Sequence, residues 1–261
     1  MLVNTCYIEE TFGLPGKVAA ITGGAGFLCS EMARGLHRSG CFVAVLDKEE
    51  GAKKIAAEII EGGGKAIACD LDSRKKADFK RCLASVLDAF DRVDILINGA
   101  GINAPTPFLK ISENEWDDIM AVQLKGTLFG CQVFGQQMLE QGSGSIINIS
   151  SASAGPPLSK AFTYSVAKMG IKNLTQNVAR EWATKGVRVN ALCPGFFPTE
   201  WSKEHFITPD RKKAILGHTP MNRYGRPEEL VGAVLWLSSD AASFVTGSEI
   251  IVDGGFSAMT I

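Results

Sequence analysis

Residues 17–47, KVAAITGGAGFLCSEMARGLHRSGCFVAVLD, decide the fold. The stretch begins with an apolar run at 17–22 that predicts a buried strand. A glycine-rich turn follows, and then Leu28, Met32 and Leu36 recur at the spacing of one helical face, which predicts a helix over 26–38. A second apolar run at 42–46 predicts another strand. Two strands without polar alternation, joined by a helix, indicate a parallel pair that is buried on both faces.

The same alternation of strand and helix continues along the chain. Further strands are predicted at 65–69, 93–97, 145–149, 187–192 and 250–252, and further helices at 50–61, 73–90, 113–140, 162–185 and 227–238. The proline-rich residues 194–226 are expected to be irregular. We therefore expect an α/β protein, with residues 1–261 forming a single doubly wound (Rossmann) domain around a mainly parallel seven-stranded sheet.

Composition excludes several classes of function. The chain has 27 Lys and Arg against 28 Asp and Glu, so it lacks the excess of cations that nucleic acids or anionic membranes attract. It contains neither an apolar run long enough to span a bilayer nor a recognisable signal peptide. Its seven cysteines include no C-x-x-C pair, which favours free thiols in a reducing compartment. We expect a cytoplasmic protein without nucleic-acid or membrane partners.

The glycine-rich turn predicts a dinucleotide site. Glycines such as Gly23 and Gly26 allow the backbone to approach a pyrophosphate, which then lies at the N-terminus of the following helix. Asp47 comes about 20 residues later, at the end of the second strand. A carboxylate there accepts hydrogen bonds from ribose hydroxyls and repels a 2′-phosphate, so the pattern favours NAD over NADP.

Three polar residues point to proton-transfer chemistry. Tyr164 and Lys168 are four residues apart on a predicted helix and therefore project from the same face. An ammonium beside a phenol stabilises the phenolate and lowers its pKa, so this tyrosine could exchange a proton with a carbinol or carbonyl oxygen. Ser151 follows a predicted strand end, where ligands of open α/β sheets bind. Ser153 is an alternative, although its spacing to Tyr164 is two residues shorter.

Taken together, these motifs resemble the short-chain dehydrogenase/reductase family over essentially the whole chain. The resemblance is carried by Thr22-Gly23, Asp70-Leu71, Asn98-Gly99-Ala100-Gly101, the set Ser151, Tyr164 and Lys168, Pro194-Gly195 with Thr199, and Val252-Asp253-Gly254-Gly255. It implies that Ser151, Tyr164, Lys168 and Gln123 form the catalytic set. It also implies a cofactor site made by Gly23, Gly26, Phe27, Leu28, Asp47, Asp70, Leu71, Asn98, Ala100, Gly101, Tyr164, Lys168, Pro194, Gly195, Phe197 and Thr199.

Two departures from the family pattern stand out. Phe27 and Cys29 occupy positions where the family usually has glycine, although the T-G-G-x-G-x-L form of its sugar-acid dehydrogenases accounts for Gly26. Gln123 replaces the family's asparagine, which bonds a water in a proton relay to the lysine. A glutamine at this position either serves the relay with shifted geometry or only kinks its helix.

The segment 194–226 is expected to cover the substrate. Residues 196–226 contain six cations (Lys203, Arg211, Lys212, Lys213, Arg223 and Arg226) against three acids (Glu200, Glu204 and Asp210). This excess could attract a carboxylate, or it could simply belong to a solvated lid. The run Pro194-Gly195-Phe196-Phe197-Pro198, with His218-Thr219-Pro220-Met221, is similar to that of hexonate dehydrogenases of the gluconate 5-dehydrogenase or mannonate oxidoreductase type.

These observations predict an NAD(H)-dependent oxidoreductase of carbohydrate metabolism that interconverts a secondary alcohol and a ketone on a sugar acid or polyol. The alternatives are a 3-oxoacyl thioester reductase and a catalytically silent NAD-binding scaffold. The three scattered histidines suggest no metal site. The family resemblance implies a homotetramer.

Overall fold

Seven strands form one sheet in the computed structural model, which describes residues 5–155, 158, 161–199, 204 and 207–259. They are β1 (Val18–Thr22), β2 (Phe42–Asp47), β3 (Ala66–Asp70), β4 (Ile95–Asn98), β5 (Gly144–Ile149), β6 (Val187–Pro194) and β7 (Glu249–Val252). Their order is β3-β2-β1-β4-β5-β6-β7, and every neighbouring pair is parallel. The predicted doubly wound fold is confirmed, and the sheet is parallel throughout rather than mainly so.

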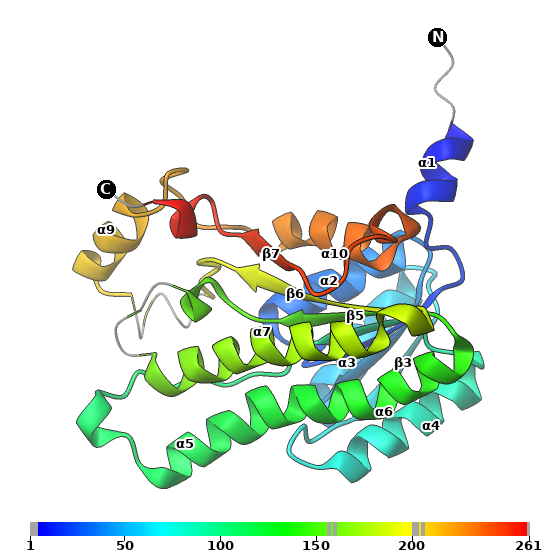
Figure 1. Cartoon of the computed structure of the whole chain (residues 1–261), viewed down its shortest axis with the longest axis horizontal. Coiled ribbons are helices and arrows are strands. Elements are labelled where there is room, and N and C mark those ends of the chain that lie inside the picture. Colours follow the sequence, from blue (N-terminus) through cyan, green and yellow to red (C-terminus); the bar gives the residue numbers. More distant parts are fainter. Residues whose placement is uncertain (1–4, 156–157, 159–160, 200–203, 205–206, 260–261) are drawn as a thin grey trace.

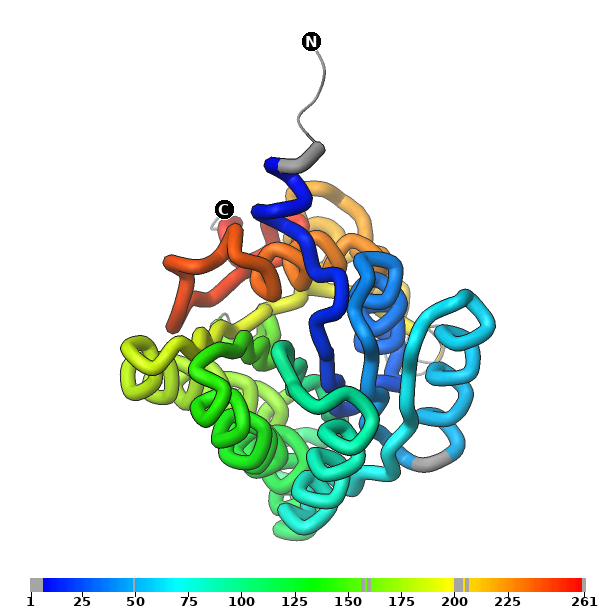
Figure 2. The backbone as a smooth tube through the Cα atoms, turned by 90° about the vertical axis from the view of Figure 1, so that its right-hand side faces the viewer, coloured from blue at the N-terminus to red at the C-terminus, as the bar shows by residue number. Residues whose placement is uncertain are grey.

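Helices cover both faces of this sheet (Figures 1 and 2). One face carries α2 (Phe27–Arg38), α3 (Glu49–Glu61) and α10 (Val231–Ser238), and the other carries α4 (Lys76–Phe90), α6 (Gly126–Gln141) and α7 (Phe162–Trp182). Each layer buries its own apolar cluster against the strands. Because both faces are buried, the strands are apolar throughout, as the sequence predicts.

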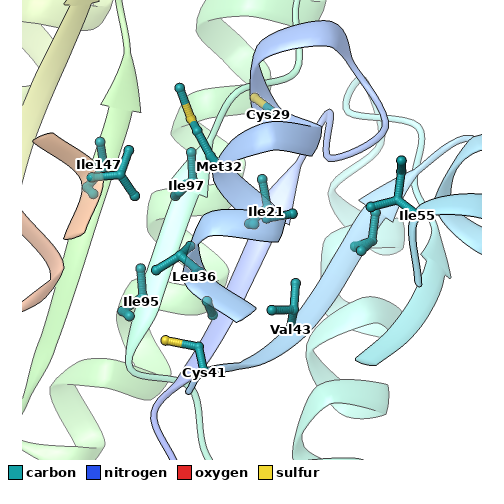
Figure 3. Close-up of a cluster of buried hydrophobic side chains, with 14 of the residues drawn as sticks. Ile21, Cys29, Met32, Leu36, Cys41, Val43, Ile55, Ile95, Ile97 and Ile147 are labelled. Atoms are coloured by element: carbon teal, nitrogen blue, oxygen red, sulfur yellow. The ribbon is translucent and has the colours of Figure 1, made fainter. Parts of the chain in front are cut away.

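The apolar stripe of α2 is the best example of this packing. Met32 and Leu36 are completely buried and lie against Ile21, Ile95 and Ile97 of the central strands (Figure 3). The spacing of four residues between Met32 and Leu36 places both on the face that meets the sheet. This contact holds the start of α2 beside the end of β1.

The predicted helix over 113–140 is interrupted in its middle. It comprises α5 (Glu113–Met120), a π-helical turn η2 (Ala121–Lys125) and α6. Ser112 is the N-cap of α5, because its Oγ accepts the N–H of Glu115 at 3.2 Å. Single π-helical turns inside α-helices concentrate at functional sites, and this one contains Gln123.

Two helices were not predicted. α9 (Pro209–Gly217) lies within 194–226, so the expectation of an entirely irregular segment is wrong. Its first turn starts at a proline, where the missing N–H costs nothing because an N–H at that position has no partner within the helix. Thr208 Oγ1 accepts the N–H of Arg211 at 3.2 Å. α1 (Thr5–Phe12) lies at the opposite end of the molecule from α9 (Figure 1).

The register of the sheet aligns the polar ends of the central strands. Thr22 of β1 pairs with Asn98 of β4, and Asn98 pairs with Asn148 of β5. Asn98 Nδ2 donates to Asn148 Oδ1 at 2.8 Å, and Asn148 Nδ2 donates to Thr175 Oγ1 of α7 at 3.0 Å. This buried chain of hydrogen bonds ties the strand ends to the helix that carries Tyr164 and Lys168.

The described part of the chain contains no helix long and apolar enough to cross a membrane. Six of the seven cysteines are free and buried, as expected for unpaired thiols, and nothing is described of the side chain of Cys6.

Gly130 tests the contact between α6 and the end of β4. A β-carbon at Gly130 would overlap Asn98 Oδ1, so we expect Gly130→Ala to lower the free energy of unfolding by about 1–3 kcal/mol. Gly232 of α10 has open space around its α-carbon, and Gly232→Ala is expected to leave stability unchanged or to raise it by up to about 1 kcal/mol. Urea denaturation of both variants checks this, and equal stabilities would contradict the packing described here.

Candidate active site

The turns after β1 and β4 are in direct contact. Gly23 has a φ of +65°, and a β-carbon there would lie 2.7 Å from the Cα of Ala100. Thr22 Oγ1 accepts the N–H groups of Gly99 at 3.1 Å and Ala100 at 3.3 Å. Glycine is therefore required at position 23 both by backbone conformation and by the neighbouring chain.

The glycine-rich turn runs directly into the N-terminus of α2. Gly26 precedes the helix without a side-chain cap, and its own N–H bonds Gly23 O at 2.9 Å. Phe27 is half exposed, while Leu28 is partly buried against the core. Uncapped N–H groups at a helix N-terminus are suited to an anion such as a pyrophosphate.

Cys29 takes up the space that a glycine would leave between α2 and the end of β4. Its side chain is only 5% exposed, and a β-carbon at Gly99 would overlap Cys29 Sγ. Burial raises the pKa of the thiol to about 12, so the group stays neutral and acts as a small apolar side chain. The departure at Cys29 is therefore accommodated by Gly99, and the close packing of helix on sheet survives.

Asp47 stands at the end of β2, opposite the glycine-rich turn. Its Oδ2 accepts the N–H of Ala25 at 2.9 Å, and its Oδ1 accepts the N–H of Lys48 at 2.7 Å. The next strand end is joined to it, because Leu71 N donates to Asp47 O at 3.0 Å. Asp70 is exposed and Leu71 is buried, so a carboxylate and an apolar surface lie side by side there.

Asn98 has an unusual environment for a buried amide. Its Oδ1 is buried, and no partner for that atom is found among the described residues. A buried acceptor without a partner is costly and is found at functional sites. With the Gly23–Ala100 contact, the open N-terminus of α2 and Asp47, the residues present fit a dinucleotide.

Ser151, Tyr164 and Lys168 meet beyond the end of β5. Ser151 Oγ accepts hydrogen bonds from Ser153 N at 3.1 Å and Ser153 Oγ at 3.0 Å. Lys168 Nζ lies 5.4 Å from the centroid of the Tyr164 ring and donates to Ile149 O at 2.7 Å. Of the two serines, Ser151 is the one whose side chain lowers the pKa of Tyr164.

Burial dominates the electrostatics of this group. It lowers the pKa of Lys168, which is 3% exposed, to about 8, because an ammonium loses its hydration there. It also raises the pKa of Tyr164, and the side chain of Ser151 opposes that rise. The sequence-based expectation that Lys168 lowers the pKa of the phenol is therefore not met, since Lys168 Nζ is turned towards Ile149 O.

A cavity of about 470 Å³ opens in front of Ser151 and Tyr164. Its other walls are made by Gly195, Phe197 and Thr199 after β6, and by residues that the sequence did not single out as site residues, namely Asn103, Ile207, Arg211 and Ile215. Pro194 is buried as the last residue of β6. Arg211 belongs to the cation-rich segment that the sequence singles out as able to attract a carboxylate, and of that segment Lys203 and Glu200 lie outside the described residues.

Gln123 is buried beside the turn after β4. Its Nε2 donates to Ile102 O at 2.8 Å, and a β-carbon at Gly101 would lie 2.8 Å from its Oε1. Its backbone oxygen accepts from Thr127 Oγ1 at 2.7 Å. These contacts hold residues 101–102 in place, and a part for Gln123 in a proton relay stays a prediction.

No group of His, Cys, Asp or Glu side chains among the described residues is arranged to hold a metal ion.

Known oxidoreductases resemble this chain over nearly its whole length. A family model described as enoyl-(acyl carrier protein) reductase matches residues 25–257. An uncharacterized oxidoreductase, UxuB, of Bacillus subtilis (strain 168) is 40% identical, over 94% of this chain and 96% of its own. An NAD-dependent glycerol dehydrogenase of Listeria innocua is 34% identical, over 95% of this chain and 96% of its own. A crystal structure of a gluconate 5-dehydrogenase from Burkholderia cenocepacia J2315, in complex with NADP and tartrate, superposes with a TM-score of 0.92 at 30% identity, covering 96% of this chain and 99% of that one.

Lys168 makes stability depend on pH in a defined direction. Its pKa of about 8 in the folded protein lies below the usual 10.5, so between these values the unfolded chain binds more protons and stability rises with pH. From about pH 7.5 to about pH 9.5, the wild type should gain roughly 2 kcal/mol relative to Lys168→Met. Chemical denaturation at both pH values measures this gain. The exposed Lys54→Met serves as the control, and a constant difference between Lys168→Met and wild type would refute the burial effect.

Proposed function

The chain belongs to the short-chain dehydrogenase/reductase family, and on that premise we propose that it interconverts a secondary alcohol and a ketone on a polyol or sugar acid, with NAD as the hydride carrier. The observation that carries the proposal is that Ser151 and Tyr164 line one cavity at the carboxyl end of the sheet, with Lys168 Nζ 5.4 Å from the centroid of the Tyr164 ring. The names of the relatives support the substrate class, since one is a glycerol dehydrogenase and another a gluconate 5-dehydrogenase.

Each side chain has a distinct part in the proposed reaction. Nicotinamide, when bound, supplies the redox chemistry by exchanging a hydride at C4 with the carbinol carbon. Tyr164 Oη takes the proton of the substrate hydroxyl during oxidation and returns it during reduction. Ser151 would donate a hydrogen bond to the same substrate oxygen, and Lys168 would hold the ribose of a bound nicotinamide. Burial raises the pKa of Tyr164 in the structure described here, and the side chain of Ser151 opposes this rise.

The cofactor-binding set is proposed in the same way. Gly23, Gly26, Phe27 and Leu28 would border the pyrophosphate, Asp47 the adenosine ribose, and Asp70 and Leu71 the adenine. Asn98, Ala100, Gly101, Pro194, Gly195, Phe197 and Thr199 would flank the nicotinamide half. Support comes from the contact between the turns after β1 and β4, and from the position of residues 195–199 on the wall of the cavity that Tyr164 faces.

A homotetramer of this chain also remains our proposal. It draws support from a groove lined by Met120, Leu124, Leu128 and Leu174 between η2, α6 and α7, next to the exposed apolar side chain of Met169. Burying such a surface against a second copy would remove apolar area from water. The cytoplasmic location expected from the cysteines stays a prediction.

Replacing Tyr164 tests the proposed mechanism. With NAD and a panel of sugar acids and polyols, we expect Tyr164→Phe to lower kcat by roughly 100- to 10,000-fold, because proton transfer is lost while the ring remains. Binding of NADH, followed by fluorescence, should be retained. Tyr7→Phe, on the exposed face of α1, is the matched control. Full turnover by Tyr164→Phe would refute the mechanism, and tight NAD binding without turnover by the wild type would favour the silent scaffold.

Replacing Asp47 tests the choice of cofactor. Asp47→Asn keeps an acceptor for the N–H of Ala25 but removes the charge that would repel a 2′-phosphate, so we expect the ratio of kcat/KM for NADP to that for NAD to rise by about 10- to 30-fold. Asp88→Asn, an exposed acid on α4, should not change the ratio. A wild type that prefers NADPH and reduces 3-oxoacyl thioesters would instead support the alternative function.

A further inference from the structure

We propose that Arg211 recognises a carboxylate of the substrate, which makes this enzyme selective for sugar acids over neutral polyols. The inference rests on the proposed function and narrows its substrate class. It concerns a residue of α9, in the segment that follows β6, and not Ser151, Tyr164 or Lys168, which we call the proton-transfer set.

Arg211 lies at the cavity in which the proposed reaction takes place. Its side chain lines the same cavity of about 470 Å³ as Ser151 and Tyr164, and cavities of roughly 300–1,000 Å³ are usual for small ligands. A molecule whose carbinol meets Tyr164 therefore lies in the same cavity as Arg211. Arg211 is half buried, so part of its hydration has already been removed.

The described wall of the cavity combines one cationic side chain with several uncharged polar ones. Among the described residues that line it, Arg211 is the only Lys, Arg, Asp, Glu or His. The other polar side chains on the wall are hydroxyl and amide groups, from Asn103, Ser151, Ser153, Tyr164 and Thr199. Hydroxyls and amides pair with the hydroxyls of a polyol chain, whereas a guanidinium is matched by a carboxylate, which it can bond with two parallel N–H groups.

The charged residues next to Arg211 in the sequence lie away from the cavity. Asp210, Lys212 and Lys213 flank Arg211 in the sequence, but they are exposed and do not line the cavity. The first turn of α9 is anchored, since Thr208 Oγ1 accepts the backbone N–H of Arg211 at 3.2 Å. Among the cations of this segment that the structure describes, Arg211 is thus the one that lines this cavity, while the adjacent Lys212 and Lys213 are exposed.

Recognition at one end of the substrate also has a kinetic signature. Arg211 would bind a group that does not react, and such an interaction is equally strong in the ground state and the transition state. Its loss should therefore raise KM more than it lowers kcat. A neutral polyol lacks the carboxylate, so the substitution should leave its kcat/KM nearly unchanged.

The test compares D-gluconate and D-mannonate with their neutral counterparts, glucitol and mannitol, using the NAD-loaded enzyme. We expect Arg211→Gln to lower kcat/KM for the acids by roughly 10- to 100-fold, mainly through KM, and to change it less than about 2-fold for the alditols. Arg211→Lys should recover part of the loss because it restores the charge without the planar fork. Lys212→Gln, one residue further on the exposed side, should behave as the wild type.

Equal losses on acids and alditols, or no loss on the acids, would overturn the assignment. Binding of the two acids to the NADH-loaded protein, measured by calorimetry, separates this outcome from a failure of the proposed function. If the wild type turns over none of the four compounds, the proposed function fails. The carboxylate site then stands only if an acid still binds and Arg211→Gln weakens that binding, and it falls if neither acid binds. Thermal unfolding of each variant identifies a change due to misfolding.

Discussion

Across β1, β4 and β5, Thr22, Asn98 and Asn148 stand in one row, and hydrogen bonds continue from Asn148 to Thr175 of α7. Parallel pairing forces the carboxyl ends of these strands to one edge of the sheet, and the buried amides link that edge to the helix with Tyr164 and Lys168. The two halves of the site, the glycine-rich turn and the proton-transfer set, are therefore placed relative to each other by strand register. A slip of one residue would turn these polar groups to the opposite face.

The chemistry that this arrangement permits has a cost in stability. Burying the ammonium of Lys168 lowers its pKa to about 8, and Asn98 keeps an acceptor without a partner among the described residues. Both features weaken the folded protein and both lie where a cofactor and substrate would supply the missing interactions. The apolar clusters on the two faces of the sheet offset this cost, because they bury the helices without relying on the polar edge.

Much of the cavity wall is built by a different part of the molecule from this edge of the sheet. The chain after β6 closes the cavity with Gly195, Phe197 and Thr199, and α9 adds Arg211 and Ile215. Such segments vary without disturbing the sheet, so relatives of one fold can serve different alcohols. Relatives of this chain are named for different substrates, glycerol in one case and gluconate in another.

Local pattern was enough to predict the seven strands, the helix that begins after Ser112, the turn at Gly23 and the pairing of Tyr164 with Lys168 on one helix face. These features depend on neighbours in the chain, through apolar periodicity and spacing. The fit of Cys29 against Gly99, the rise in the pKa of Tyr164 and the arrival of Arg211 at the cavity depend on groups far apart in sequence. Folding alone brings those groups together, and burial, which has no local signature, then decides which of them are charged and what they can bind.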